Sequence, residues 1–346
     1  MNEDIEKLVA MYEQSSMDII GVIQSISGGL TKRRQLELLK QIGVIISITQ
    51  GDATGIILEI IEAAYKEGSN EATEELRAQG VKNIEASFKA GIHREAVQNI
   101  ADDMFYTVLE ASDNMSQDAK DRLEMITTKA NQRSLIEGQT RREATKKAVA
   151  EATAKGITGA IYKNGAKVPV EKYLANTIQY YQRRAHVDGS INRMTENNKD
   201  LLYVNSVGIT CSLCAQYQGR VYSISGKDSR FPPLTNRPPY HGHCVHSAYL
   251  WSEEFQDPKD IADMLQTSNR PFEDNRSEAK IRKYDEMQRK ASRKNETRKQ
   301  WIRYKSRMPD LPDLKTFGSQ KARNTKKYKK WQQNFQLFGL IIKEGG

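Results

Sequence analysis

The stretch from Cys211 to His246, CSLCAQYQGRVYSISGKDSRFPPLTNRPPYHGHCVH, holds all three cysteines of the chain and three of its five histidines. Cys211 and Cys214 form a C-x-x-C pair, a spacing that lets two thiolates on a tight turn reach one tetrahedral metal ion at about 2.3 Å. His241, Cys244 and His246 supply a second group, H-x-x-C-x-H. A Zn²⁺ ion needs four of these five candidate ligands, and His241 and His246 compete for the fourth place.

The segment between the two ligand groups offers little material for a hydrophobic core. It contains a short strand with polar turns and the proline-rich loop FPPLTNRPPY. A bound metal ion would stabilise such a segment. Two alternatives stay open: the cysteines are unligated core residues, or Cys244 forms a disulfide with Cys211 or Cys214. A catalytic zinc site fits less well, because Asp228 is the only acidic residue between the groups. We therefore predict a structural zinc ion.

The positive charge of the chain is concentrated in its last fifth. The 346 residues carry a formal net charge of +9, and the segment 276–346 alone has 21 Lys and Arg against 7 Asp and Glu. Aromatic residues interleave with these cations, a pattern that suits contact with phosphates and bases. We predict a DNA-binding surface formed by Arg282, Lys283, Arg289, Lys290, Arg298, Lys299, Trp301, Arg303, Lys326, Lys327, Lys329 and Lys330.

Targeting and membrane signals are weak. The chain opens with the acidic, amphipathic MNEDIEKLVAMYEQ, which does not resemble a secretory signal. The most apolar region, Gln41 to Tyr65, is interrupted by Asp52 and Glu59, so we expect no membrane span. Three cysteines in a chain of this length make no disulfide framework, which fits a reducing compartment such as the cytoplasm.

Hydrophobic periodicity predicts a mainly α protein with an embedded small α+β domain. We expect a helical domain or arm over 1–155, an α+β domain with the Cys/His cluster over 156–257, and a basic helical region over 258–346. A break is expected at Gly51-Asp52, helices over about 70–90, 93–112 and 116–155, a hairpin at Asn164-Gly165, and three short strands around the Cys/His stretch. His93 and His186 lie on helical segments, where we expect surface or capping roles.

The motifs of the Cys/His stretch resemble those of tailed-phage minor capsid and head-morphogenesis proteins. The run C-x-x-C-x-x-x-x-G-R-V-Y, then F-P, then P-P-Y-H-x-x-C-x-H is similar to the group of the Mu protein F and to the minor capsid protein 2 group. In the latter, a W-Q-G-K-V-Y-like run precedes N-C-R-H, and YQGRVY (217–222) and CVH (244–246) stand in those places. Val245 replaces a frequent Arg, and His246 replaces a Cys of the Mu-like branch. The likeness covers about 156–251.

This resemblance implies a virion protein, present in few copies inside the head near the portal, that helps assemble the head. The expected partners are the portal protein, other capsid proteins and phage DNA, with no small-molecule substrate; during assembly the protein would be in the host cytoplasm. The sequence shows no convincing catalytic constellation, so we expect no enzyme. The alternative is a metal-dependent nuclease or toxin-like enzyme with a basic substrate-binding tail. A nucleic-acid-binding regulator of the host is a third hypothesis.

Overall fold

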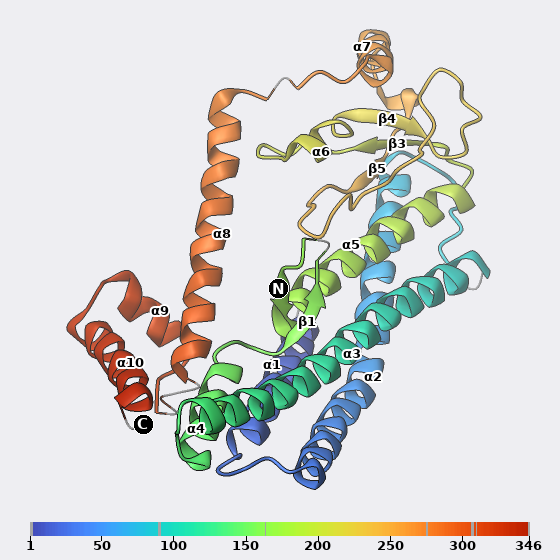
Figure 1. Ribbon diagram of the computed structural model, residues 1–346. Helices are drawn as coiled ribbons and strands as arrows, with labels where there is room; N and C mark the ends of the chain where they lie inside the picture. The colour runs from blue at the N-terminus through green and yellow to red at the C-terminus, as the bar shows by residue number, and fades with distance from the viewer. Residues whose placement is uncertain are drawn as a thin grey trace. The chain divides into compact units, whose positions relative to one another are not determined.

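A computed structural model describes residues 3–88, 91–162, 164–274, 276–305, 308 and 310–344. Helices dominate this part of the chain and the strands are short (Figure 1), so the prediction of a mainly α protein with a small β-containing part is confirmed. The helices are α1 (Glu3–Gln24), α2 (Lys32–Ala78), α3 (Gly91–Ile136), α4 (Arg141–Ala152), α5 (Val170–Glu196), α6 (Ser212–Ala215), α7 (Pro258–Asn269), α8 (Glu278–Lys305), α9 (Leu314–Ala322) and α10 (Lys326–Glu344). The strands are β1 (Thr158–Ile161), β2 (Lys167–Pro169), β3 (Leu201–Val204), β4 (Arg220–Ser223) and β5 (Ala248–Leu250).

The chain forms two compact units, each assembled from stretches that are distant in sequence. One unit, here called the sheet unit, comprises Met1–Ile5, Thr54–Thr107 and Ala175–Met287. The other, the hairpin unit, comprises Glu6–Ala53, Val108–Leu174 and Gln288–Gly346. Several long helices contribute residues to both units. The sequence-based division into 1–155, 156–257 and 258–346 stays a prediction.

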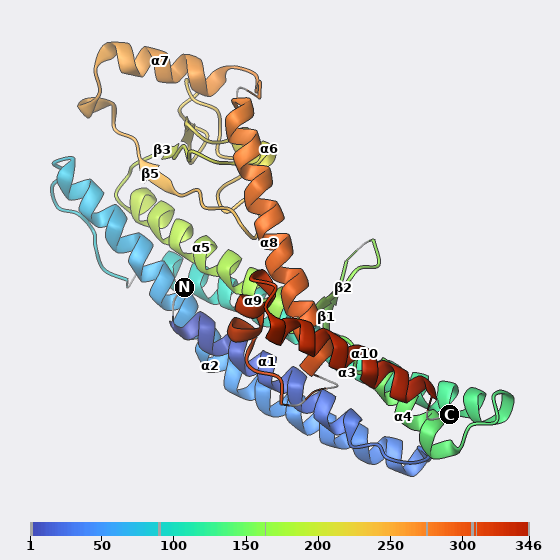
Figure 2. The same cartoon turned by 90° about the vertical axis from the view of Figure 1, so that its left-hand side faces the viewer.

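In the hairpin unit, parts of α1, α2 and α3 pack lengthwise (Figure 2). Their contacts include a hydrogen bond of 3.3 Å between the hydroxyls of Tyr12 and Ser112, and one of 2.6 Å from Gln35 to Thr127. Burial raises the pKa of Tyr12. The β1–β2 hairpin follows α4 and turns at Gly165, whose φ of 77° suits glycine, so the predicted hairpin is confirmed.

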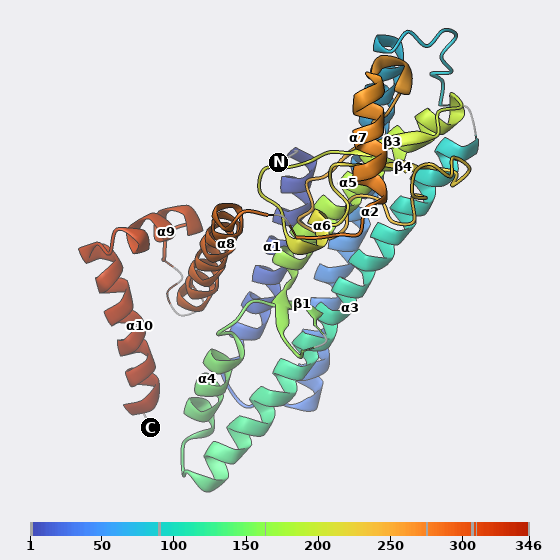
Figure 3. The same cartoon turned by 90° about the horizontal axis from the view of Figure 1, so that it is seen from above.

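The last helices form an aromatic cluster of their own within the hairpin unit. The end of α8 lies beside α9, with α10 nearby (Figure 3). Trp301, Tyr304, Phe317 and Tyr328 are buried in this cluster, and the rings of Tyr304 and Phe335 stack at 4.3 Å between centroids. These aromatic side chains therefore stabilise the packing of helices.

In the sheet unit, α2 and α5 approach each other unusually closely. A Cβ added to Gly68 would lie 2.0 Å from the carbonyl oxygen of His186, and one added to Gly189 would lie 2.2 Å from that of Tyr65. The Ser190 hydroxyl donates a hydrogen bond of 2.9 Å to the Gly68 carbonyl. Any larger side chain at Gly68 or Gly189 would therefore push the two helices apart.

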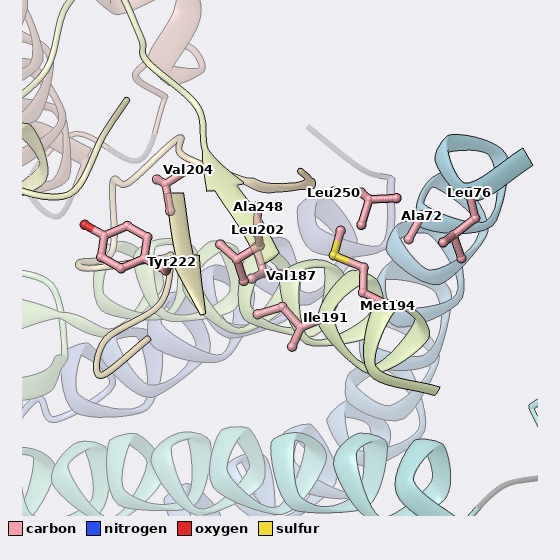
Figure 4. Packing of buried hydrophobic residues seen from close by; sticks show 10 residues of the cluster. All are labelled: Ala72, Leu76, Val187, Ile191, Met194, Leu202, Val204, Tyr222, Ala248 and Leu250. Atoms are coloured by element: carbon pink, nitrogen blue, oxygen red, sulfur yellow. The ribbon is translucent and has the colours of Figure 1, made fainter. Parts of the chain in front are cut away.

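A three-stranded antiparallel sheet, in the order β4-β3-β5, packs against this helix pair. Figure 4 shows Val187, Ile191 and Met194 of α5 close to Leu202 of β3. Ala72, Leu76, Val204, Tyr222, Ala248 and Leu250 complete the buried cluster. Because β3 pairs with both β4 and β5, the loops that leave these strands begin close together. Those loops carry the cysteines. The three strands predicted around the Cys/His stretch are confirmed.

Four local predictions were wrong. The helix continues through Gly51-Asp52, because buried Ile46, Ala53 and Ile56 offset the cost of a helical glycine, about 1 kcal/mol. The helix predicted over 70–90 ends at Ala78. The helices predicted over 93–112 and 116–155 are one helix to Ile136, after which Gly138 adopts a φ of 68° and Thr140 caps α4.

The fourth error concerns His93, which is buried and not a surface or capping residue. Its Nδ1 lies 2.8 Å from the Tyr65 hydroxyl, and its Nε2 lies 3.0 Å from Glu196. Burial raises the pKa of Tyr65 to about 12. Tyr65, His93 and Glu196 belong to a polar network around Arg193, which is fully buried on α5. A sequence pattern of helix faces gives no signal for such a network.

Helix α2 also contains an apolar window long enough to cross a membrane. Length and composition alone do not identify a membrane span, because the core helices of globular proteins share them. Leu38, Ile42 and Ile46 of this helix are buried.

Candidate metal site

The first ligand group lies on a single tight turn between β3 and β4. Cys211 caps the short helix α6, and its Sγ accepts a hydrogen bond of 3.3 Å from the backbone N–H of Cys214. The chain then reaches β4 through Gly219, whose φ of 71° is in the left-handed region and whose N–H donates to the Val204 carbonyl at 2.8 Å. This turn directs the thiols of Cys211 and Cys214 to the same side.

The second ligand group lies on the loop that enters β5. The backbone N–H of Cys244 donates to the His241 carbonyl at 2.9 Å, which closes a turn of the chain over H-x-x-C. The ring of Tyr240, just before this turn, stacks on Tyr217 of the first group at 4.3 Å between centroids. This stack and the pairing of β3 with both neighbours bring the two groups together.

All five predicted ligands lie in one cluster. The Nε2 atom of His241 is 3.2 Å from the Cys211 Sγ and 3.1 Å from the Cys214 Sγ. The Cys214 Sγ is 3.8 Å from the Cys244 Sγ, which in turn is 3.5 Å from Nδ1 of His246. Two potential metal-binding groups result, Cys211–Cys214–His241 and Cys214–Cys244–His246, each with its ligand atoms within 4.8 Å of one another. Cys214 belongs to both.

The donor atoms suit zinc. Thiolate sulfur and imidazole nitrogen are the ligands of structural Zn²⁺ sites. Cys214, Cys244 and His246 are each no more than 2 % exposed, so water has little access to them. The three cysteines are free, and the 3.8 Å between the Cys214 and Cys244 sulfurs far exceeds the roughly 2.05 Å of a disulfide bond. The residues present therefore fit a metal ion.

Hydrogen bonds distinguish the two histidines. The Gln218 Oε1 atom accepts from the backbone N–H of Val207 at 3.1 Å and lies 3.0 Å from Nε2 of His246. Since that oxygen can only accept, Nε2 of His246 carries a proton, and in the neutral ring Nδ1, which faces Cys244, is the nitrogen that can bind a metal ion. Metal-bound histidines are typically held in this way by a second partner.

His241 has the opposite arrangement. Its Nδ1 accepts a hydrogen bond of 3.2 Å from the backbone N–H of His243, so Nε2 carries the proton and faces the sulfurs of Cys211 and Cys214. A protonated nitrogen donates to thiolates but does not bind a metal ion. This tautomer favours His246 over His241 as a metal ligand, in the group with Cys214 and Cys244.

The electrostatics of the cluster favour one thiolate in the absence of metal. A hydrogen bond with the Cys214 thiol lowers the pKa of Cys244, while the same hydrogen bond and burial raise the pKa of Cys214. The Arg183 guanidinium donates a hydrogen bond to the Cys244 carbonyl and adds positive charge next to the cluster. Because metal ligands must lose their protons, metal binding at this cluster is expected to release protons.

The affinity for zinc should distinguish the roles of the two histidines. We expect the substitution His246→Ala to weaken zinc binding by at least about tenfold, while His241→Ala has a smaller effect. His246→Cys should retain the metal, because a thiolate also binds zinc. Competition with a chromophoric chelator, at a pH where each variant is folded, measures the affinity.

His243→Ala is the matched control, since this exposed histidine lies in the same turn. Equal losses for His241→Ala and His246→Ala would contradict the assignment of His246. A larger loss for His241→Ala would reverse it.

Neither potential metal group contains a carboxylate among the described residues. Asp228, the only acidic residue between the two ligand groups, pairs with Arg230, which lowers the pKa of Asp228. Arg230 also contacts Glu253 at 3.0 Å. Asp228 is thus engaged in an ion pair, not hydrogen-bonded to a ligand.

The predicted DNA-binding residues occupy two helices and differ in exposure. Trp301 is buried, and its Nε1–H donates to the Pro312 carbonyl at 2.8 Å, so the expectation that its ring is free to stack on bases is wrong. Arg298 pairs with Glu13 and Glu171. The side chains of Lys299 and Arg303 lie outside the described residues. The remaining predicted cations are exposed: Arg282, Lys283, Arg289 and Lys290 on α8, and Lys326, Lys327, Lys329 and Lys330 on α10.

The sequence analysis did not identify the roles of Gln218 and Arg183. Gln218 contacts His246, and Arg183 donates to the Cys244 carbonyl. Gln218 is part of the YQGRVY run, so the motif did carry a signal for it. Arg183 lies on α5, 28 residues before Cys211, and only the packing of the sheet on α5 brings it to the Cys244 carbonyl.

A family model described as phage minor capsid protein 2 matches residues 1–338. The match extends the likeness well beyond the Cys/His stretch, into the helical first half and the basic last part. No curated protein matches the chain. No solved structure matches it either.

Proposed function

The chain belongs to the phage minor capsid protein 2 family, and we propose that it is a structural protein of the phage head that associates with the portal. The family match over 1–338 carries this proposal, because it covers both units and not only a short motif. The family supports a place in the virion and contact with other capsid proteins. A position inside the head near the portal is our proposal.

In this function, the Cys/His cluster binds one structural Zn²⁺ ion. The ligands proposed are Cys211, Cys214, Cys244 and His246, with His241 donating a hydrogen bond to the thiolates. Two of the four ligand side chains lie on the loop between β3 and β4 and two on the loop before β5. The metal ion would fasten these two loops to each other.

A structural role is favoured over the alternative of a metal-dependent nuclease or toxin-like enzyme. The buried, sulfur-rich cluster resembles closed zinc sites, whereas hydrolytic sites keep one position open for water. Asp228 is engaged by Arg230, so it is not placed as a general base. We therefore propose that the protein is not an enzyme.

Exposed cations on α8 and α10 are proposed to contact packaged DNA. Lys326, Lys327, Lys329 and Lys330 project from the first turns of α10, and their charges would neutralise phosphates. Since Trp301 and Tyr328 are buried, this contact would rest on charge and not on base stacking. It is therefore expected to weaken steeply as the salt concentration rises.

The contact with the portal is proposed at an exposed apolar stripe on α2. Leu36, Val44 and Ile48 are 67, 51 and 60 % exposed and lie at helical spacings of eight and four residues, on one face. Exposed apolar side chains grouped in this way typically mark protein interfaces. The family identifies capsid proteins as the partners such a face would meet.

The proposal predicts that the full chain is found in purified phage particles and is captured by the portal protein. We expect the double substitution Val44→Ser/Ile48→Ser to reduce capture by about tenfold or more, because a partner would bury these side chains. Mass spectrometry of particles and pull-downs with purified portal protein measure the two outcomes.

Gln41→Ser/Ser47→Asn is the matched control, since it changes two exposed polar positions of the same helix, close in sequence to Val44 and Ile48. Absence of the chain from both particles and portal pull-downs would overturn the proposed function. Capture that is equally strong for both double variants would remove the α2 stripe from it.

A further inference from the structure

A basic pocket of about 320 Å³ lies within the sheet unit, next to the loops of the Cys/His cluster. Four cationic side chains line it: Arg220, Arg270, Arg276 and Lys280. Glu273 is the one carboxylate among its lining residues, all of which are described. The pocket therefore favours an anion.

Two of the cations are held in place by backbone carbonyls. Arg220 of β4 donates to the carbonyls of Ser268 and Arg270 at 3.2 and 3.0 Å. Arg276 donates to the Thr210 carbonyl at 2.9 Å and pairs with Asp274 at 2.6 Å. Because Asp274 offsets the charge of Arg276, the attraction for an anion rests on Arg220, Arg270 and Lys280, against the single negative charge of Glu273.

Thr210 gives an independent sign that the pocket takes a ligand. Thr210 is 6 % exposed and lines the pocket, and its hydroxyl has no hydrogen-bond partner within the described part of the chain. A buried hydroxyl without a partner lowers stability, so such groups usually have a ligand or water as partner. An anion in the pocket would offer an acceptor oxygen.

The chemistry of the lining points to phosphate. Arginine forks and a hydroxyl donor suit the several oxygens of a phosphate group. Phe272 also lines the pocket and is 38 % exposed, so an aromatic face lies beside the cations, as in proteins that bind single-stranded nucleic acid. An acidic peptide would match the charge but would make no use of the ring.

We propose that this pocket binds a backbone phosphate of DNA, with a neighbouring base against Phe272. The inference goes beyond the proposed DNA contact of α8 and α10, which rests on charge alone. It depends neither on the portal nor on the cations of α10, and of the α8 cations it involves only Lys280. The pocket shares Gln218 with the Cys/His cluster, because Gln218 lines the pocket and contacts His246. The carbonyl held by Arg276 belongs to Thr210, immediately before Cys211. The cluster thus supports one wall of the pocket.

The test uses the full chain and a fluorescently labelled single strand of thirty thymidines, followed by anisotropy at several salt concentrations. We expect Arg270→Gln/Lys280→Gln to weaken binding about tenfold or more, and to reduce the slope of log Kd against log salt by about 1.4. Lys227→Gln/Lys259→Gln is the control, since it removes the same charge from exposed positions outside the pocket.

Thr210→Val adds a readout that a purely structural role would not produce. The substitution keeps the shape of the side chain and removes the unpaired hydroxyl, so we expect weaker DNA binding together with an unchanged or higher Tm. Weaker binding with a lower Tm would count against the proposal, as would unchanged binding.

Other outcomes separate this inference from the proposed function. Equal affinities and salt slopes for the two double variants would contradict DNA binding at this pocket. They would not affect the proposed contact with the portal. Loss of binding only on replacing the four lysines of α10 would place DNA on that helix instead. Full displacement of the strand by an equimolar acidic peptide would identify an acidic protein as the ligand and overturn the proposal.

Discussion

Replacing Cys214 by serine is expected to release the metal ion and to unfold the loops that carry both ligand groups. Cys214 is 1 % exposed and belongs to both potential metal groups, so no other single cysteine couples the two loops in the same way. Structural zinc sites in small domains contribute apparent binding free energies of about 10–16 kcal/mol near neutral pH. We expect zinc content to fall from about one equivalent to near zero in this variant.

Elemental analysis gives the zinc content, and hydrogen exchange of residues 205–247 reports the unfolding of the loops. Leu213→Ser is the control, since Leu213 lies in the same turn and is 41 % exposed. Chelation of the wild-type protein should reproduce the exchange pattern of Cys214→Ser. Freely alkylated cysteines in the folded, wild-type protein, with no zinc, would contradict a metal site.

The Cys/His cluster could be predicted from sequence because its ligand residues lie at short and characteristic spacings. C-x-x-C and H-x-x-C-x-H each place ligands within one turn of chain, so the structure had only to bring two local groups together. The three strands bring these two groups together, and they were also predictable, as short apolar runs between turns. The tautomers of the two histidines could not be predicted from sequence. That of His246 depends on Gln218, and that of His241 on the backbone N–H of His243 in the folded turn.

The helices show where such reasoning fails. The local preference of glycine predicts a break at Gly51, but packing on both sides of Gly51 outweighs this preference. The position of Trp301 among cations predicts stacking on bases, yet its ring packs in an aromatic cluster. In both cases tertiary contacts, which no local pattern contains, decide the outcome.

The basic pocket illustrates the same point for function. Its cations come from β4, from the segment after α7 and from the start of α8, and no motif joins Arg220, Arg270 and Lys280. Along the sequence, by contrast, the excess of positive charge lies in the last fifth of the chain. The hydrogen bond of 3.0 Å from the Val221 N–H to the Ser268 hydroxyl holds the end of α7 against β4 and so brings Arg270 towards Arg220.

Arg193→Met is expected to destabilise the sheet unit by about 3–5 kcal/mol, which is the usual effect of removing one partner of a buried ion pair. Arg193 is fully buried, pairs with Glu196 at 2.7 Å, and donates to the carbonyls of Glu85, Ala86 and Ser87 at 2.8–3.0 Å. These three carbonyls belong to the segment after α2, which has no regular secondary structure of its own.

Methionine fills much of the same volume but removes the donor of the Ala86 and Ser87 carbonyls and leaves Glu196 with His93 alone. The segment 81–88 should therefore also exchange its amide hydrogens faster. Urea unfolding followed by circular dichroism measures the free energy of unfolding. Arg77→Met is the control, because Arg77 is exposed and its ion pair with Glu74 should contribute less than about 1 kcal/mol. Arg193→Lys should rescue only part of the loss, since one ammonium group cannot replace the guanidinium fork. If Arg193→Met were as stable as Arg77→Met, the network would have no role in holding this segment on α5.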